Sequence, residues 1–156
     1  MLYFEDLKIG YRYGLDAPAA PPYGPHQVTR EQIIEFGEQW DPRPQHVDEA
    51  AARETTFGGL IASGAHAFAL WTRFALETAN KTERIAIIAG LGSDFRIAAP
   101  IRPDDVLSLQ VEIVAKRESQ SRPDSGIVTA EHALSNQSGV VVLTNRAVTL
   151  VSKRPA

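Results

Sequence analysis

An aspartate and a histidine, Asp41 and His46, lie five positions apart in a segment that also contains Pro42 and Pro44. A carboxylate and an imidazole that flank one water molecule can take a proton from it and deliver a proton to a reacting carbon. The two prolines restrict the backbone between these residues, which would hold both side chains toward one pocket. The spacing therefore predicts a general acid–base site. Either residue can serve as the base, because two groups that share a water titrate as a unit.

Gly64 stands at the beginning of a long apolar segment, where we predict a buried helix from Ser63 to about Ala79. The first N–H groups of a helix have no partner within it and lie at the positive end of the helix dipole, so they can bind an oxyanion. A glycine leaves room for a ligand to approach the backbone, although it would also permit tight helix packing. Gly64 is therefore a second candidate site residue.

Local signals place further helices around the Asp41–His46 segment. Thr29 and Gln32 form a capping-box pattern, which predicts a helix that ends at Asp41–Pro42. A short helix should follow from Asp48 to Arg53. The first of these helices should bury three apolar side chains, Ile33, Phe36 and Trp40.

The central segment and the C-terminal half differ in periodicity. Apolar residues cover most of the circumference of the predicted helix 63–79, which indicates burial on nearly all sides. Apolar and polar residues then alternate at 107–113, and segments 127–134 and 140–151 are rich in strand-forming residues. Turn sequences at 122–126 and 136–139 make these strands antiparallel. We interpret the proline-rich stretch 17–25 as a loop and the Gly90–Gly92 pair as a turn or a close-packing site.

These elements predict an α+β fold in a single domain, residues 1–156, with an antiparallel sheet around one long helix. The net charge of −3 and the lack of a basic block argue against nucleic-acid binding. The absence of cysteine excludes a cysteine nucleophile and thiolate metal sites. His46 and Asp48 lack a third ligand at a convincing spacing, so we expect no metal. No membrane span or secretion signal is evident, and we expect a cytoplasmic protein.

Residues 40–66 resemble the MaoC-like and (R)-specific enoyl-CoA hydratase family. Its motif reads approximately D-x-N-P-x-H, followed by a phenylalanine-containing turn and an I-x-x-G helix entry; this chain has Asp41 to His46, Phe57, and Ile61 to Gly64. The opening YFEDLKIG and the segment 100–105 are also similar, although Asp104 replaces the family's glycine. The resemblance implies a hotdog fold, in which a sheet wraps around one long helix, and assembly as a homodimer or higher oligomer.

The same resemblance implies reversible hydration of an enoyl-CoA to an (R)-3-hydroxyacyl-CoA. Asp41 and His46 would be catalytic, Gly64 would bind the thioester oxygen, and Ser63 and Thr72 would be further substrate-binding positions. Coenzyme A would be part of the substrate, and no separate cofactor is expected. Arg43 replaces the usual asparagine of the motif.

Two other functions remain open at this level. A hotdog thioesterase would direct water to the thioester carbonyl rather than to the β-carbon. A non-catalytic acyl-binding subunit would keep the fold without the reaction, because Arg43 could pair with Asp41 and withdraw it from the water. In that case Asp41 should lie away from His46 and from the pocket.

Overall fold

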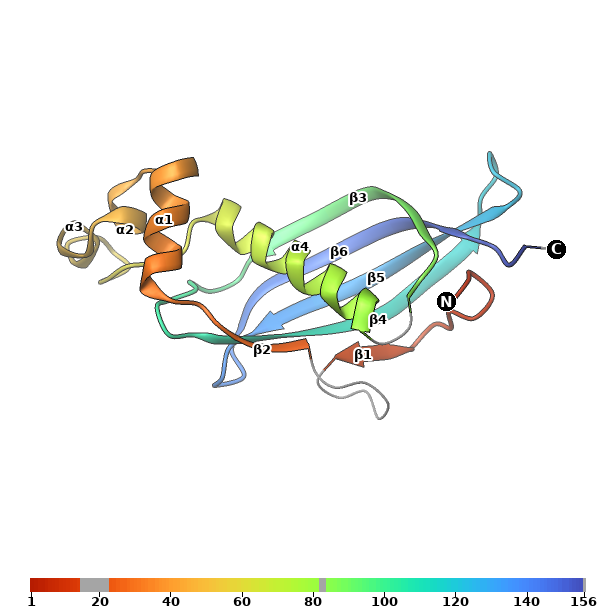
Figure 1. Cartoon of the computed structure of the whole chain (residues 1–156), viewed down its shortest axis with the longest axis horizontal. Coiled ribbons are helices and arrows are strands. Elements are labelled where there is room, and N and C mark those ends of the chain that lie inside the picture. Colours follow the sequence, from red (N-terminus) through yellow and green to blue (C-terminus); the bar gives the residue numbers. More distant parts are fainter. Residues whose placement is uncertain (15–22, 82–83, 156) are drawn as a thin grey trace.

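The computed structural model describes residues 1–14, 23–81 and 84–155, and its centre is one antiparallel sheet that curves around a long helix, α4 (Gly64–Lys81) (Figure 1). The sheet is six-stranded with the order β1-β4-β5-β6-β3, and β2 also pairs with β4. The strands are β1 (Arg12–Gly14), β2 (Tyr23–Gln27), β3 (Ile87–Ile97), β4 (Val106–Glu118), β5 (Ser125–Ser135) and β6 (Val141–Ser152). The predicted α+β arrangement is confirmed.

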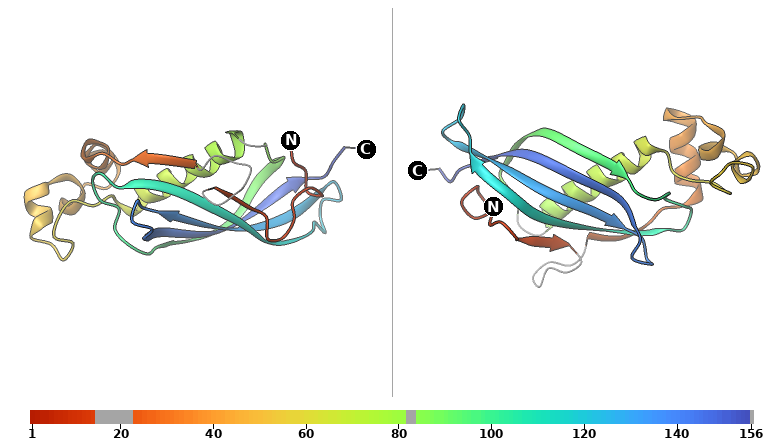
Figure 2. Two further views of the ribbon diagram at one scale, coloured as in Figure 1. Left: turned by 90° about the horizontal axis from the view of Figure 1, so that it is seen from below. Right: turned by 180° about the vertical axis from the view of Figure 1, so that it is seen from behind.

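Three short helices lie beyond one end of the sheet: α1 (Arg30–Trp40), α2 (Pro44–Val47) and α3 (Glu49–Arg53) (Figures 1 and 2). The predicted capping box of α1 is present, since Thr29 accepts the Gln32 N–H at 3.2 Å and Gln32 accepts the Thr29 N–H at 3.0 Å. The helix ends before Asp41, as predicted. The expected burial of Trp40 is wrong, because it is the last residue of α1 and 66% of it is exposed. Ile33 is buried and Phe36 is half-buried.

The segment between α1 and α3 is more regular than predicted. Pro44 occupies the first turn of α2, where its missing N–H costs no hydrogen bond. α3 follows as expected, with Asp48 as N-cap accepting the N–H groups of Ala50 and Ala51 at 2.8 and 3.0 Å. The Asp41–His46 segment is therefore held between two capped helices.

The prediction that α4 is buried on nearly all sides is wrong for this chain. The helix buries Ala67, Leu70 and Phe74 against the sheet and His66 against Phe36 of α1, but 40% of Phe68 and 60% of Leu76 are exposed. The sheet covers only one face of the helix, so the opposite face keeps an apolar stripe.

The three predicted strands form the centre of the sheet. Alternate residues of β4, β5 and β6 face α4 and supply most of the core, including Leu107, Leu109, Val111, Leu134 and Leu143. Gly90 and Gly92 lie in β3 at a β-bulge rather than in a turn, with no atom within 4 Å of an added Cβ. Residues 17–22 of the expected proline-rich loop lie outside the described residues. Pro25 is part of β2, an outer strand that tolerates proline.

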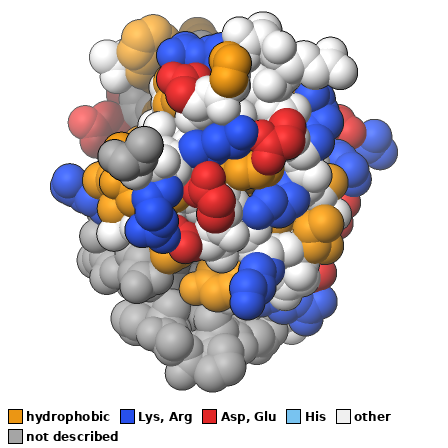
Figure 3. All heavy atoms as spheres, turned by 90° about the vertical axis from the view of Figure 1, so that its right-hand side faces the viewer, with side chains coloured by type: hydrophobic (Ala, Val, Ile, Leu, Met, Phe, Trp, Pro, Cys, Tyr) orange, Lys and Arg blue, Asp and Glu red, His pale blue; other side chains and the backbone are white. Residues whose placement is uncertain are grey.

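Charges of both signs are interspersed at the end of the molecule that carries the termini (Figure 3). Ion pairs found near the C-terminus and the β4–β5 turn include Arg154–Asp6, Lys153–Glu118 and Arg122–Asp124. Within the described residues, no helix combines the length and the apolar character needed to cross a membrane.

Candidate active site

His46 is held in a defined orientation in α2. Its side chain is buried, with 3% of the residue exposed, and Nδ1 lies 2.8 Å from the carbonyl oxygen of Ile61. A carbonyl can only accept a hydrogen bond, so Nδ1 must carry a proton in this contact. The neutral ring then has a lone pair on Nε2. This atom is buried and finds no hydrogen-bond partner among the described residues.

Asp41, the C-cap of α1, lies close to the unpartnered nitrogen of His46. Its Oδ2 is 3.7 Å from His46 Nε2, which is too long for a hydrogen bond between them. Arg43 donates to both carboxylate oxygens, with Nε–Oδ1 at 2.7 Å and Nη2–Oδ2 at 2.6 Å. These hydrogen bonds are the main cause that lowers the pKa of Asp41, against the opposing effect of partial burial. The Arg43–Asp41 pair is present, yet Asp41 remains near His46.

A cavity of about 330 Å³ adjoins the histidine. His46, Arg43 and Gly64 contribute to its wall, whereas Asp41 does not; the other lining residues are Gln45, Phe57, Ile61, Ala62, Ala67 and residues 97–101. A Cβ on Gly64 would come within 3.1 Å of the Cδ1 atom of Ile97. The glycine therefore keeps the cavity open at the N-terminus of α4.

Ser63 and Thr72 are placed differently from these residues. Ser63 is buried and its Oγ accepts the His66 N–H at 3.1 Å, so it caps α4 directly before Gly64. Thr72 donates to the Phe68 carbonyl at 2.9 Å and lines a second cavity farther along α4. The structure thus brings Asp41, His46 and Gly64 to one region and leaves Thr72 at another.

Two positions that support His46 were missed by sequence reasoning. A Cβ on Gly37 of α1 would lie 2.8 Å from the His46 carbonyl oxygen and 2.9 Å from Val47 Cγ1. Only glycine allows this approach of α1 to α2, and a glycine inside a helical pattern is the signal that could have indicated it. The Ile61 contact involves a backbone carbonyl, so no side-chain signal exists for it.

His66 is buried and packs against an aromatic ring. It is 7% exposed and stacks on Phe36 with ring centroids 4.5 Å apart, and burial lowers its pKa to about 4. In the part of the chain that the structure describes, no three histidine, aspartate or glutamate side chains gather closely enough to hold a metal ion.

Comparison with known proteins decides the family. Residues 17–136 match the family described as the MaoC like domain. The chain belongs to the MaoC-like dehydratase family. A relative, the uncharacterized protein YdeM of Bacillus subtilis, is 30% identical over 81% of this chain and 88% of its own.

Solved structures agree with the MaoC-like assignment. The MaoC-like dehydratase from Rhodospirillum rubrum superposes with a TM-score of 0.87 and is 36% identical, with full coverage of both chains at 100%. The R-hydratase PhaJ1 from Pseudomonas aeruginosa shares the fold at 22% identity, with a TM-score of 0.72 over 97% of this chain and 86% of that chain. The expected hotdog fold of a MaoC-like protein is confirmed.

Proposed function

We propose that this protein reversibly adds water across the 2,3 double bond of an enoyl-CoA, giving an (R)-3-hydroxyacyl-CoA, with Asp41 and His46 as the catalytic pair. Membership of a dehydratase family supports a reaction of this class. The observation that carries the proposal is the fixed imidazole of a residue that lines the cavity. Its Nδ1 is engaged by the Ile61 carbonyl, and its Nε2 lies 3.7 Å from a carboxylate oxygen and has no hydrogen-bond partner among the described residues.

The geometry suggests how the pair would handle a proton. Asp41 Oδ2 and His46 Nε2 are both acceptors when the ring is neutral, and at 3.7 Å one water could donate a hydrogen bond to each. As the water oxygen attacks the β-carbon, its proton would pass to His46 Nε2, and Asp41 would stabilise the resulting imidazolium. The pair would then return a proton to the α-carbon. The reverse sequence removes water.

Gly64 would supply the third requirement, stabilisation of the negative charge on the thioester oxygen. Its N–H is at the first position of α4 and its residue lines the same cavity as His46. A carbonyl oxygen placed there would receive a hydrogen bond that strengthens as the enolate forms. The acyl chain would extend along the cavity-lining face of α4, which continues from Gly64 through Ala67 to Trp71 and Ala75.

We further propose that the protein acts as a homodimer formed through β3. This strand is at an edge of the sheet, and it exposes Ile87, Ile88, Leu91 and Ile97 by 43–52%. An exposed apolar edge strand pairs readily with another copy. Ile97 lines the cavity at His46 and Ile87 lines the second cavity, so a partner on this edge would border both.

Sedimentation equilibrium tests the dimer, with a dimer expected for the wild type and a monomer for Leu91→Lys. The lysine would place a charge at the exposed centre of β3, where it would have to be desolvated on pairing. A monomeric wild type at assay concentrations would contradict this interface.

One observation favours a second function, a non-catalytic acyl-CoA-binding subunit. The bidentate Arg43 pair occupies both oxygens of Asp41, although the Arg43 side chain is 62% exposed and solvent weakens such a pair. Loss of the enoyl absorbance of crotonyl-CoA and longer enoyl-CoAs separates the two functions. Turnover supports the hydratase, whereas tight acyl-CoA binding without turnover supports the binding subunit.

Replacing Arg43 should change the pH dependence of hydration. The Arg43 guanidinium lowers the pKa of Asp41, so in Arg43→Gln this pKa should rise toward its ordinary value. As the pH falls, the Asp41 carboxylate of this variant then takes up a proton at a higher pH than in the wild type. Because the proposed reaction needs the ionised carboxylate, the acid limb of kcat/KM should move to higher pH. Arg53→Gln is the matched control, because Arg53 is exposed at the end of α3. An unchanged acid limb in Arg43→Gln would rule out Asp41 as its source.

A further inference from the structure

A polar row crosses the otherwise apolar inner face of the sheet. His132 on β5 pairs directly with Asn145 on β6, and residues directly opposite one another in a sheet project from the same face. Both are buried, with 9% of His132 and 1% of Asn145 exposed. Their inward-facing neighbours on the same strands are apolar: Val128, Ala130, Leu134, Leu143 and Ala147. The imidazole of His132 and the amide of Asn145 therefore each require a polar partner on this apolar face.

Three nitrogen atoms in or beside this row lack a hydrogen-bond partner among the described residues. The indole of Trp71 on α4 meets the His132 ring edge-on at a centroid distance of 5.4 Å. Among the described residues, no hydrogen-bond partner is found for Trp71 Nε1, His132 Nδ1 or Asn145 Nδ2, although all three atoms are buried. Asn145 Oδ1 is already engaged by the Ser93 hydroxyl at 2.7 Å. Buried polar groups are nearly always hydrogen-bonded, so these nitrogens indicate a ligand that supplies the missing partner.

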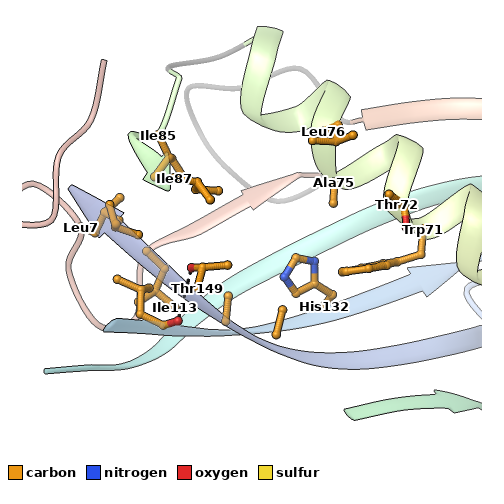
Figure 4. A pocket seen from close by; sticks show the side chains of 14 residues that line it. Leu7, Trp71, Thr72, Ala75, Leu76, Ile85, Ile87, Ile113, His132 and Thr149 are labelled. Atoms are coloured by element: carbon orange, nitrogen blue, oxygen red, sulfur yellow. Dashed lines mark hydrogen bonds between the residues drawn. The ribbon is translucent and has the colours of Figure 1, made fainter. Parts of the chain in front are cut away.

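Space for a ligand lies beside the row. Trp71 and His132, but not Asn145, line a cavity of about 180 Å³ between α4 and the sheet, far more than one water needs (Figure 4). The other lining residues are mostly apolar, and they include Ala75, Ile113, Val128 and Ala147. Trp71 is seven residues beyond Gly64, roughly 10 Å along the same helix. A molecule anchored at Gly64 could therefore reach the indole.

The chemistry of Trp71 and His132 restricts the partner. Trp71 Nε1 only donates, so a ligand atom beside it must accept, as an oxygen does. Burial lowers the pKa of His132 to about 4, so its ring is neutral near pH 7. Neither the indole nor the neutral imidazole carries a charge. A carboxylate buried here would have no counter-ion, which is costly. An uncharged hydroxyl or keto oxygen needs none.

We propose that Trp71 and His132 select acyl chains that carry an uncharged oxygen, a hydroxyl or keto group, in their distal part. The inference rests on the proposed function, because it takes the enoyl thioester to be anchored at Gly64. The hydrocarbon part of the chain packs against the apolar wall of the second cavity, and the oxygen accepts a hydrogen bond from the indole N–H of Trp71. The preferred substrate is therefore an oxygenated enoyl-CoA of medium length.

The test compares matched pairs of substrates: hexenoyl-, octenoyl- and decenoyl-CoA, each with its ω-hydroxy counterpart. We expect the ω-hydroxy member of at least one pair to have a kcat/KM about tenfold higher in the wild type. Trp71→Phe keeps the aromatic ring and removes the N–H, so this ratio should fall toward one. Val128→Ala, which alters the same wall without touching a polar group, should preserve it. A wild-type ratio near one for all pairs would overturn the proposal.

A binding measurement separates this inference from the proposed reaction. The chain has two tryptophans, and in Trp40→Phe the fluorescence reports Trp71 alone. Saturated octanoyl-CoA and ω-hydroxyoctanoyl-CoA are not hydrated, so titrations with them do not depend on catalysis. Tighter binding of the hydroxylated ligand supports the inference even if no enoyl-CoA is turned over. Equal binding, or no fluorescence change with either ligand, contradicts it even if hydration is active.

Discussion

Asp41→Asn and His46→Gln should each lower kcat/KM for hydration of enoyl-CoA by about 100-fold or more, the usual contribution of a positioned acid or base. The asparagine keeps the shape of Asp41 but cannot stabilise an imidazolium. Glutamine at position 46 can still hydrogen-bond, yet it has no basic nitrogen to accept the proton of water. Both residues adjoin the same site, with Asp41 Oδ2 at 3.7 Å from His46 Nε2, so the double variant should be little worse than either single one. The kcat/KM of the two single variants and of the double variant is measured from the loss of the enoyl absorbance.

The control for these variants is Glu38→Gln. It makes the same carboxylate-to-amide change at an exposed position of α1, three residues before Asp41. Its kcat/KM should remain at the wild-type value. If Asp41→Asn kept wild-type activity while His46→Gln lost it, the proposed pair would be reduced to a single residue, and the Arg43–Asp41 contact would be structural. Additive losses in the double variant would contradict the shared water.

The features that the sequence predicts correctly are those determined by local chemistry. The Thr29–Gln32 capping box, the end of α1 before Pro42 and the Asp48 cap each depend on a few adjacent residues, and each is present. The alternation at 107–113 identifies β4 because one face of that strand meets the core. The candidate site benefits from the same locality, since Asp41 and His46 are separated by one short, proline-restricted segment.

What the sequence does not predict depends on contacts between distant segments. The burial of Trp40 and of the outer face of α4 was expected from apolar composition, but composition does not tell which face another element covers. The Gly90–Gly92 pair has turn chemistry and yet lies in a bulged edge strand. The tautomer of His46 depends on the Ile61 carbonyl, fifteen residues away, which any residue type would supply.

Gly37 illustrates how a distant contact can control the site, and Gly37→Ala should lower both stability and activity. Alanine is favoured over glycine inside a helix by about 1 kcal/mol, so helix propensity alone predicts stabilisation. The added Cβ, however, would lie 2.8 Å from the His46 carbonyl oxygen, a backbone atom that cannot rotate away. The overlap must push α2 from α1, at a cost of roughly 1–3 kcal/mol. Thermal unfolding should therefore show a lower Tm.

The displaced segment is the one that carries His46, so the loss of activity should exceed what the fraction of unfolded protein explains. A shift of about 1 Å in a catalytic group can cost on the order of 100-fold in rate, and the imidazole would also lose its alignment with the Ile61 carbonyl. Glu38→Ala, which puts the same side chain at the exposed neighbouring position, should leave kcat/KM unchanged. A Gly37→Ala protein with a raised Tm and wild-type activity would mean that propensity outweighs the contact. The position of His46 would then be set by the Ile61 hydrogen bond and the helix-initiating Pro44, without help from α1.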